Sequence, residues 1–226
     1  MDVNFAPLWI SLKTATVATI VVFVFGIVFA RLFARREFTG KTVLESLFLL
    51  PMVLPPTVVG FGLLYLFGRN AFLGRLLEEL FGLQIVFTPY SVVLAAAVVS
   101  FPLMYQSAKA AFQQYDASLE QVAYTMGASR FRVFWTISFP LAWPGLMSGI
   151  VLAFARALGE FGATLMVAGY IPGVTETIPL AIYFAVESGD EMTAGIWVVI
   201  SSLLGFLMLL WLNGRNERIR RRLTGE

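Results

Sequence analysis

Five apolar stretches, each near the length of a bilayer-spanning helix, constrain the fold of this chain more than any other feature. They occupy residues 9–33, 44–67, 90–112, 145–169 and 192–213. A helix needs about 20 apolar residues to cross the hydrocarbon core, because each residue advances it by only about 1.5 Å. Backbone groups in lipid must be satisfied within their own segment. The stretches therefore predict an all-α membrane protein with about five transmembrane helices.

Composition supports lipid as the solvent and argues against enzyme chemistry. Hydrophobic residues make up 58% of the 226 residues and charged residues 13%, which leaves too little polar surface to cover a water-soluble globule. The sequence contains no histidine and no cysteine, so the commonest metal ligands and the usual acid–base group at neutral pH are missing. We therefore expect no metal site, no bound cofactor and no catalytic residues.

Basic residues gather in the connections on one side of the predicted bundle. Three regions share this side: Arg31, Arg35, Arg36 and Lys41; Lys109, Arg130 and Arg132; and Arg215, Arg218, Arg220, Arg221 and Arg222. The opposite side carries mainly acidic residues: Glu78, Glu79, Glu176, Glu187, Asp190 and Glu191. Basic connections accumulate in the cytoplasm. This predicts an outside amino terminus and a cytoplasmic, basic tail over residues 214–226.

A shorter apolar run lies between the fourth and fifth stretches. Residues 178–186 are too few to span a bilayer, and a sixth crossing would place the arginine-rich tail outside. We expect an interfacial or re-entrant helix on the outer side.

The connection between the third and fourth stretches predicts a short helix presented to the cytoplasm. Leu119, Val122, Ala123 and Met126 recur at helical spacing, and Gly127 is a typical helix stop. Such a helix can lie on the protein's own cytoplasmic face or dock into a groove of a soluble partner. The spacing alone leaves both interpretations open.

This connection resembles the signature cytoplasmic loop of ABC importer permeases. The family pattern is Glu-Ala-Ala, three residues, Gly, nine residues, Ile, one residue and Leu-Pro. Here Ala123, Gly127, Ile137 and Pro140 occupy family positions, whereas Gln121, Val122 and Phe139 replace the expected Glu, Ala and Leu, and Glu120 is displaced by one residue.

The resemblance implies a type I ABC importer permease fold, built as a single domain over residues 1–226. In that family the loop, here about residues 116–143, contains the coupling helix that docks on the ATPase. The residues implied to couple are Glu120, Gln121, Ala123, Gly127, Ala128, Arg130, Ile137 and Pro140.

Residues 50–60, 154–164 and 177–183 narrow the resemblance to oxyanion permeases, especially those for molybdate. The implied function is the transmembrane permease subunit of an ATP-binding-cassette importer in a bacterial or archaeal cell membrane, moving molybdate by alternating access. Sulfate, thiosulfate or tungstate is the alternative within the family. A stand-alone channel or secondary transporter is the alternative from another class.

Two groups of residues are candidates for the translocation path. Pro55 and Pro56 remove backbone donors beside Thr57 and Gly60, which produces either a kink for packing or one facing a cavity. Arg156, Glu160 and Thr164 lie four residues apart, so the first two can form a structural ion pair, or Arg156 can donate to a passing oxyanion. A separate stripe of small residues at four-residue intervals predicts close helix packing: Gly145, Gly149, Ala153 and Ala157.

The chain itself is not expected to bind ATP. Gly40, Lys41 and Thr42 resemble the end of a phosphate loop, but Arg35 stands where its first glycine is required. Energy must then come from partners. The resemblance implies a second copy of this chain, cytoplasmic ATPase subunits that use ATP and Mg, and an external oxyanion-binding protein, all working in membrane lipid without nucleic acid.

Overall fold

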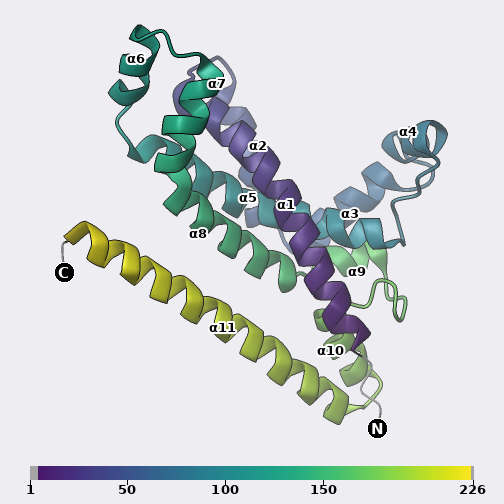
Figure 1. The fold of residues 1–226 in the computed structure, drawn as a ribbon. Helices are drawn as coiled ribbons and strands as arrows, with labels where there is room; N and C mark the ends of the chain where they lie inside the picture. Colours follow the sequence, from purple (N-terminus) through teal and green to yellow (C-terminus); the bar gives the residue numbers. More distant parts are fainter. Residues whose placement is uncertain (1–4, 225–226) are drawn as a thin grey trace.

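The computed structural model describes the backbone of residues 5–224, and these residues are all-helical, as predicted (Figure 1). The elements are α1 (Ala6–Arg35), α2 (Lys41–Val53), α3 (Pro56–Phe67), α4 (Phe72–Phe81), α5 (Pro89–Gln114), α6 (Ser118–Thr125), α7 (Arg130–Val133), the π-helix η1 (Phe134–Ser138), α8 (Phe139–Leu158), α9 (Gly162–Ala168), α10 (Ile178–Glu187) and α11 (Glu191–Thr224). The arginine side chains of the predicted tail, residues 214–226, lie outside the described part of the chain.

The core of the bundle lies where α1, α5 and α8 pack together. Small residues make this packing close: a Cβ added to Gly149 would lie 2.8 Å from the Cβ of Ser107, and one on Gly145 would lie 2.6 Å from the Cβ of Ala111. Ala153 is fully buried in the same cluster. The predicted stripe of small residues is therefore confirmed as the surface that packs α8 on α5.

The second apolar stretch, predicted as one span over residues 44–67, is broken. The helices α2 and α3 meet at an angle of 117°. A residue that precedes proline is pushed into an extended conformation, and Leu54 and Pro55 both adopt one, with ψ of 144° and 137°. Two consecutive prolines thus end α2 and start α3 in a new direction, because each forces the residue before it out of the helix.

The fourth span begins and ends earlier than the predicted 145–169. A continuous helix runs from Arg130 through η1 to Leu158, and α9 follows as a separate short helix. The prediction assigned residues 116–143 to a cytoplasmic connection and so excluded the mostly apolar residues 133–144, which the structure places in the same continuous helix. After Leu158, the Glu160 carboxylate accepts the backbone N–H of Ala163 at 2.8 Å and so begins α9 in place of a helix continuation.

The C-terminal helices α10 and α11 form a smaller cluster. Ile178, Ala181 and Trp197 are buried together, and the N–H of Ile178 donates to the Ser11 hydroxyl of α1 at 2.8 Å. The short helix predicted over residues 178–186 is therefore present and packed against protein. In Figure 1, α10 lies near the amino-terminal end of α1, whereas α6 and α7 lie near its other end.

Four helices among the described residues are long and apolar enough to cross a membrane, and a fifth span results if the bent α2–α3 pair counts as one. The four are Ala6–Arg35, Pro89–Gln114, Arg130–Leu158 and Glu191–Trp211. Apart from the break and the shifted fourth span, this agrees with the predicted set of about five.

Candidate coupling site and translocation path

The short helix α6 ends at the predicted glycine. Gly127 has a φ of +85°, a left-handed conformation that costs an L side chain roughly 1–2 kcal/mol. The N–H of Ala128 donates to the carbonyl of Ala123 at 3.0 Å, and that of Gly127 to Tyr124 at 3.0 Å. This pair of bonds is a Schellman motif, which satisfies the last carbonyls of the helix and reverses the chain.

The next helix starts two residues later with its own cap. The hydroxyl of Ser129 accepts the backbone N–H of Arg132 at 3.3 Å, in the manner of an N-cap serine. Only Gly127 and Ala128 separate the Met126 cap of α6 from this serine. The turn between α6 and α7 is therefore tight and held by backbone hydrogen bonds at both ends.

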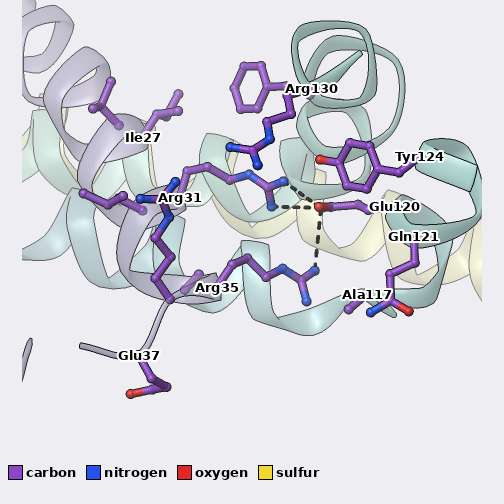
Figure 2. A pocket seen from close by; sticks show the side chains of 14 residues that line it. Ile27, Arg31, Arg35, Glu37, Ala117, Glu120, Gln121, Tyr124 and Arg130 are labelled. Carbon is purple, nitrogen blue, oxygen red and sulfur yellow. Dashed lines mark hydrogen bonds and ion pairs between the residues drawn. The ribbon is translucent and has the colours of Figure 1, made fainter. Parts of the chain in front are cut away.

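Glu120 fixes α6 to the membrane bundle. Its carboxylate is 6% exposed and receives both guanidinium nitrogens of Arg31, at 2.8 and 2.6 Å, in a fork-to-fork pair (Figure 2). The hydroxyl of Tyr115 donates to the same carboxylate, the hydroxyl of Ser138 donates at 2.9 Å, and Arg35 lies 3.8 Å away. We call these five residues the Glu120 clasp; it joins α1, the end of α5, α6 and η1.

The clasp also sets the charge of Glu120. Burial by itself raises the pKa of a carboxyl group. The hydrogen bonds from Arg31, Tyr115 and Ser138 outweigh burial and lower the pKa of Glu120 to about 2. The carboxylate is therefore ionised at every physiological pH.

The opposite face of α6 is apolar and exposed. Leu119, Val122 and Met126 project from it, and Phe131 of α7 lies exposed after the turn. An exposed apolar knob on a short helix is the form in which one protein docks into a groove of another.

The predicted coupling residues extend from α6 through the turn and α7 into η1 and α8, and they differ in exposure. Gln121, Gly127, Arg130 and Pro140 are exposed, whereas Ala123, Ala128 and Ile137 are half-buried. Glu120 alone among them is buried, so it holds the helix in place and is not available to a partner.

The predicted path residues lie where α3 crosses α9. A Cβ on Gly60 would lie 2.7 Å from the Cα of Ala163, and Thr164 is buried. Pro55 and Thr57 are exposed on the neighbouring surface. Gly60 thus serves helix packing and Thr164 is enclosed by protein, while the exposed edge of the break is the part that can face a path.

Arg156 and Glu160 form the ion pair that their spacing predicts. A guanidinium nitrogen lies 2.7 Å from the carboxylate, which is 2% exposed, whereas the arginine side chain keeps 31% of its surface exposed. The other oxygen of Glu160 accepts the Ala163 N–H. The carboxylate therefore has two structural roles, and Arg156 presents its remaining surface outward.

Sequence reasoning missed the partners of Glu120 and of Glu45. From the sequence alone, Arg31 and Arg35 have no assigned partner; they serve as orientation signals, Arg35 also argues against a phosphate loop, and Tyr115 and Ser138 carry no signal. Glu45 of α2 was also missed; it accepts from Tyr105 at 3.0 Å and pairs with Lys109, which lies within α5 and not in a connection. The one sequence signal for these contacts is the presence of charged residues in or beside apolar stretches, because a charge buried in a membrane protein needs a partner.

Comparison with known proteins places this geometry in a family. The family model described as "Binding-protein-dependent transport system inner membrane component" matches residues 16–222. A putative molybdenum transport system permease protein of Bacillus subtilis is 50% identical over 208 residues, and one of Escherichia coli K12 is 46% identical over 210 residues, each alignment covering 92% of both chains. A probable sulfate transport system permease protein of Chlorokybus atmophyticus is 34% identical over 200 residues, 88% of this chain and 70% of that protein.

Solved structures share the fold at low sequence identity. A bacterial ABC transporter for import of the acidic polysaccharide alginate matches with a TM-score of 0.74 over 97% of this chain and 80% of the other, at 14% identity. The methionine ABC transporter MetNI, in an inward-facing form, matches with a TM-score of 0.70 over 97% of this chain and 95% of the other, also at 14% identity. These likenesses show an ABC importer permease fold.

Proposed function

Because the chain belongs to the family of binding-protein-dependent transport system inner membrane components, we propose that it is the permease subunit of an ATP-driven molybdate importer. The assignment of molybdate rests on sequence identity: the chain is 46–50% identical to two molybdenum permeases over 92% of both chains, but 34% identical to a sulfate permease. A family member of this kind works beside a separate ATPase and a binding protein. Sulfate, thiosulfate or tungstate is the second candidate substrate.

The proposed assembly contains two copies of this chain, two cytoplasmic ATPase subunits and an external oxyanion-binding protein. The amino terminus lies outside and the carboxyl terminus in the cytoplasm, which follows from the distribution of arginines. ATP-driven closure of the ATPase pair moves α6, and the Glu120 clasp passes that motion to α1, α5 and η1. The Schellman turn and the clasp support this because they make α6 a rigid lever.

The proposed translocation path follows the break between α2 and α3. Pro55, Pro56 and Thr57 line its exposed edge, Gly60 packs α3 against Ala163 of α9 behind it, Thr164 lies buried in α9, and Arg156 offers a forked donor to a tetrahedral oxyanion. Glu160 then weakens the hold of Arg156 on the anion, because the two already form an ion pair.

The substrate is tested with proteoliposomes that contain the permease, its ATPase and the external binding protein. We expect uptake of molybdate that requires ATP and survives a large excess of sulfate. Uptake of sulfate as fast as that of molybdate would contradict the assignment of molybdate as the specific substrate. Uptake in vesicles that contain the permease alone would indicate a channel or secondary transporter instead.

The coupling role is tested at Gly127. Gly127→Val forces a β-branched side chain into a left-handed conformation, and we expect loss of ATPase co-purification and of hydrolysis stimulated by the binding protein. Gly127→Asn should retain both, because asparagine tolerates this conformation. A Cβ at Gly127 meets nothing within 4 Å in the protomer, so a failing asparagine variant would mean that the ATPase approaches the glycine directly.

Gly82 supplies the matched control. It ends α4 with a φ of +65° and also has nothing within 4 Å of an added Cβ. Gly82→Val imposes the same kind of strain at a helix remote from α6, and should leave ATPase association normal. If Gly127→Val inserts into the membrane and couples as well as Gly82→Val, Gly127 has no coupling role.

A further inference from the structure

We propose that the junction of α1, α6 and α7 is a binding site for an anionic phospholipid. A cavity of about 1070 Å³ lies between the last turns of α1 and the α6–α7 turn. Along α1 the lining begins with the apolar Ile27 and Val28 and ends with Arg35, which Arg36 follows directly after the helix. Figure 2 shows Ile27, Arg31 and Arg35 along this wall. Arg130 of α7 lines it from the other side. The proposed lipid site does not depend on which substrate the protein transports.

The charges around the cavity do not cancel. Arg31 is matched by Glu120 at 2.6 Å, and Glu37 by Lys41 at 2.7 Å. Arg36 and Arg130, both exposed, form no ion pair with any residue that the structure describes.

Arg35 adds a further unsatisfied donor to this group. It lies 3.8 Å from a carboxylate that Arg31 already holds, and its buried Nε has no hydrogen-bond partner in the described part of the chain. A terminal nitrogen of Arg35 also donates to the Tyr115 carbonyl at 3.5 Å, so Arg35 adds positive charge to the site while Arg36 and Arg130 keep the free forked donors suited to phosphate oxygens.

The apolar wall distinguishes a lipid from a free anion. Val28 and Leu32 are 56% and 37% exposed, and they belong to a helix that is long and apolar enough to span the membrane. The cavity is thus continuous with the lipid-facing surface of α1. From Ile27 to Arg35 the helix rises about 12 Å, which places an acyl chain along the apolar turns and a phosphate among the arginines. Basic pockets between membrane helices select anionic headgroups for the same reason.

An occupant at this position would bridge α1 and α7, which the Glu120 clasp does not itself join, since the clasp connects α1 to α6 and η1. Its phosphate would accept from α1 through Arg35 or Arg36 and from α7 through Arg130. The bridge would add a second tie between the membrane bundle and the helix turn that carries α6.

The test uses the purified permease–ATPase complex, delipidated and titrated with phosphatidylglycerol or phosphatidylcholine, with bound lipid counted by native mass spectrometry. The variant Arg36→Gln/Arg130→Gln removes two exposed charges that line the cavity. We expect its affinity for phosphatidylglycerol to fall by about 30-fold, from roughly fivefold for each arginine. Phosphatidylcholine should bind weakly to both proteins. The charge-retaining variant Arg36→Lys/Arg130→Lys should keep most of the affinity.

The matched control is Arg69→Gln/Arg132→Gln, which removes two exposed charges outside the cavity and should bind phosphatidylglycerol normally. Equal loss in the control and test variants would overturn the proposal in favour of diffuse surface charge. Displacement of the lipid by millimolar inorganic phosphate would show a site for free anions instead. Binding to the isolated permease but not to the complex would show that the ATPase covers the cavity, which also overturns it.

Discussion

At the scale of residues, Glu120 shows how a carboxylate can hold a helix without contacting a partner. Its charge is matched by a forked arginine, and its remaining lone pairs are taken by two hydroxyl groups. A buried ion pair stabilises a protein only when such additional hydrogen bonds compensate for desolvation. Glu120 thus acts on the bundle, while the exposed apolar residues of α6 face outward.

The lowered pKa of Glu120 predicts the pH at which the clasp opens. A folded-state pKa of about 2 lies below the ordinary value of 4.5, so the clasp contributes fully above pH 4.5 and loses its contribution as pH falls toward 2. Because the chain has no cysteine, Gln121→Cys can carry one environment-sensitive dye on α6. We expect its acid transition near pH 2, and a transition at clearly higher pH in Arg31→Gln. Identical transitions near pH 4.5 in both proteins would contradict the clasp.

Arg156→Glu/Glu160→Arg would rebuild an ion pair, but an arginine cannot accept the Ala163 N–H, so the swap should not restore stability. Arg156→Gln/Glu160→Gln keeps an acceptor oxygen and removes both charges, and should unfold close to the native temperature. If Arg156 meets the anion, this folded variant will transport poorly.

The control for that measurement is Glu37→Gln/Lys41→Gln, which neutralises a surface pair at the same spacing and should change stability by less than about 1 kcal/mol. Full thermal stability of the Arg156→Glu/Glu160→Arg swap would show that the bond to Ala163 does not matter.

At the scale of elements, α6 illustrates why short helices need tertiary support. Eight residues are too few to be stable as an isolated helix in water, because the free-energy cost of nucleation exceeds the stabilisation from so few hydrogen bonds. The Schellman turn closes one end, and Glu120 fixes the first turn to α1. The sequence predicted this helix and its stop through the spacing of apolar residues and Gly127.

The contact between α3 and α9 predicts opposite effects for two neighbouring glycines. Gly60→Ala would place a Cβ 2.7 Å from the Cα of Ala163, which forces the helices apart and should cost about 1–3 kcal/mol. Gly62→Ala meets nothing within 4 Å and should be neutral or stabilise α3 by up to about 1 kcal/mol. Thermal unfolding of the purified protein measures both. Equal unfolding temperatures would mean that α3 and α9 do not pack closely.

At the scale of the whole molecule, the arrangement of helices is consistent with the proposed topology. Ser11 of α1 contacts α10 at one end, and Arg31 contacts α6 at the other, so α6 and α10 lie at opposite ends of α1 (Figure 1). A coupling helix in the cytoplasm then requires α10 on the outer side. The amino terminus lies with α10.

We therefore expect the amino terminus outside and the carboxyl terminus in the cytoplasm. A carboxyl-terminal alkaline phosphatase fusion should be inactive, and a fluorescent protein fused there should be bright. The opposite pair of results would invert the topology. A phosphatase fusion placed after Gly82, in the connection between α4 and α5, should be active and serves as the control.

The sequence by itself determined the all-helical membrane class, a set of about five spans, the short helix α6 with its glycine stop and the spacing that allows Arg156 to pair with Glu160. These features depend on local quantities: the length of apolar runs, helical spacing and the conformational freedom of glycine. The start of the fourth span was predicted too late, because residues 116–143 were assigned to the cytoplasmic connection although residues 133–144 are mostly apolar and continue the helix.

The tertiary structure decided which distant residues meet. Arg31 and Glu120 are 89 residues apart, and Glu45 and Lys109 are 64 apart, so no periodicity could pair them. The second role of Glu160, as acceptor of the Ala163 N–H, could not be predicted either, because it depends on where the backbone of α9 lies. The sequence shows that a buried charge needs a partner, but the packing of the helices selects that partner, because electrostatic and hydrogen-bond energies depend on distance and burial in the folded chain.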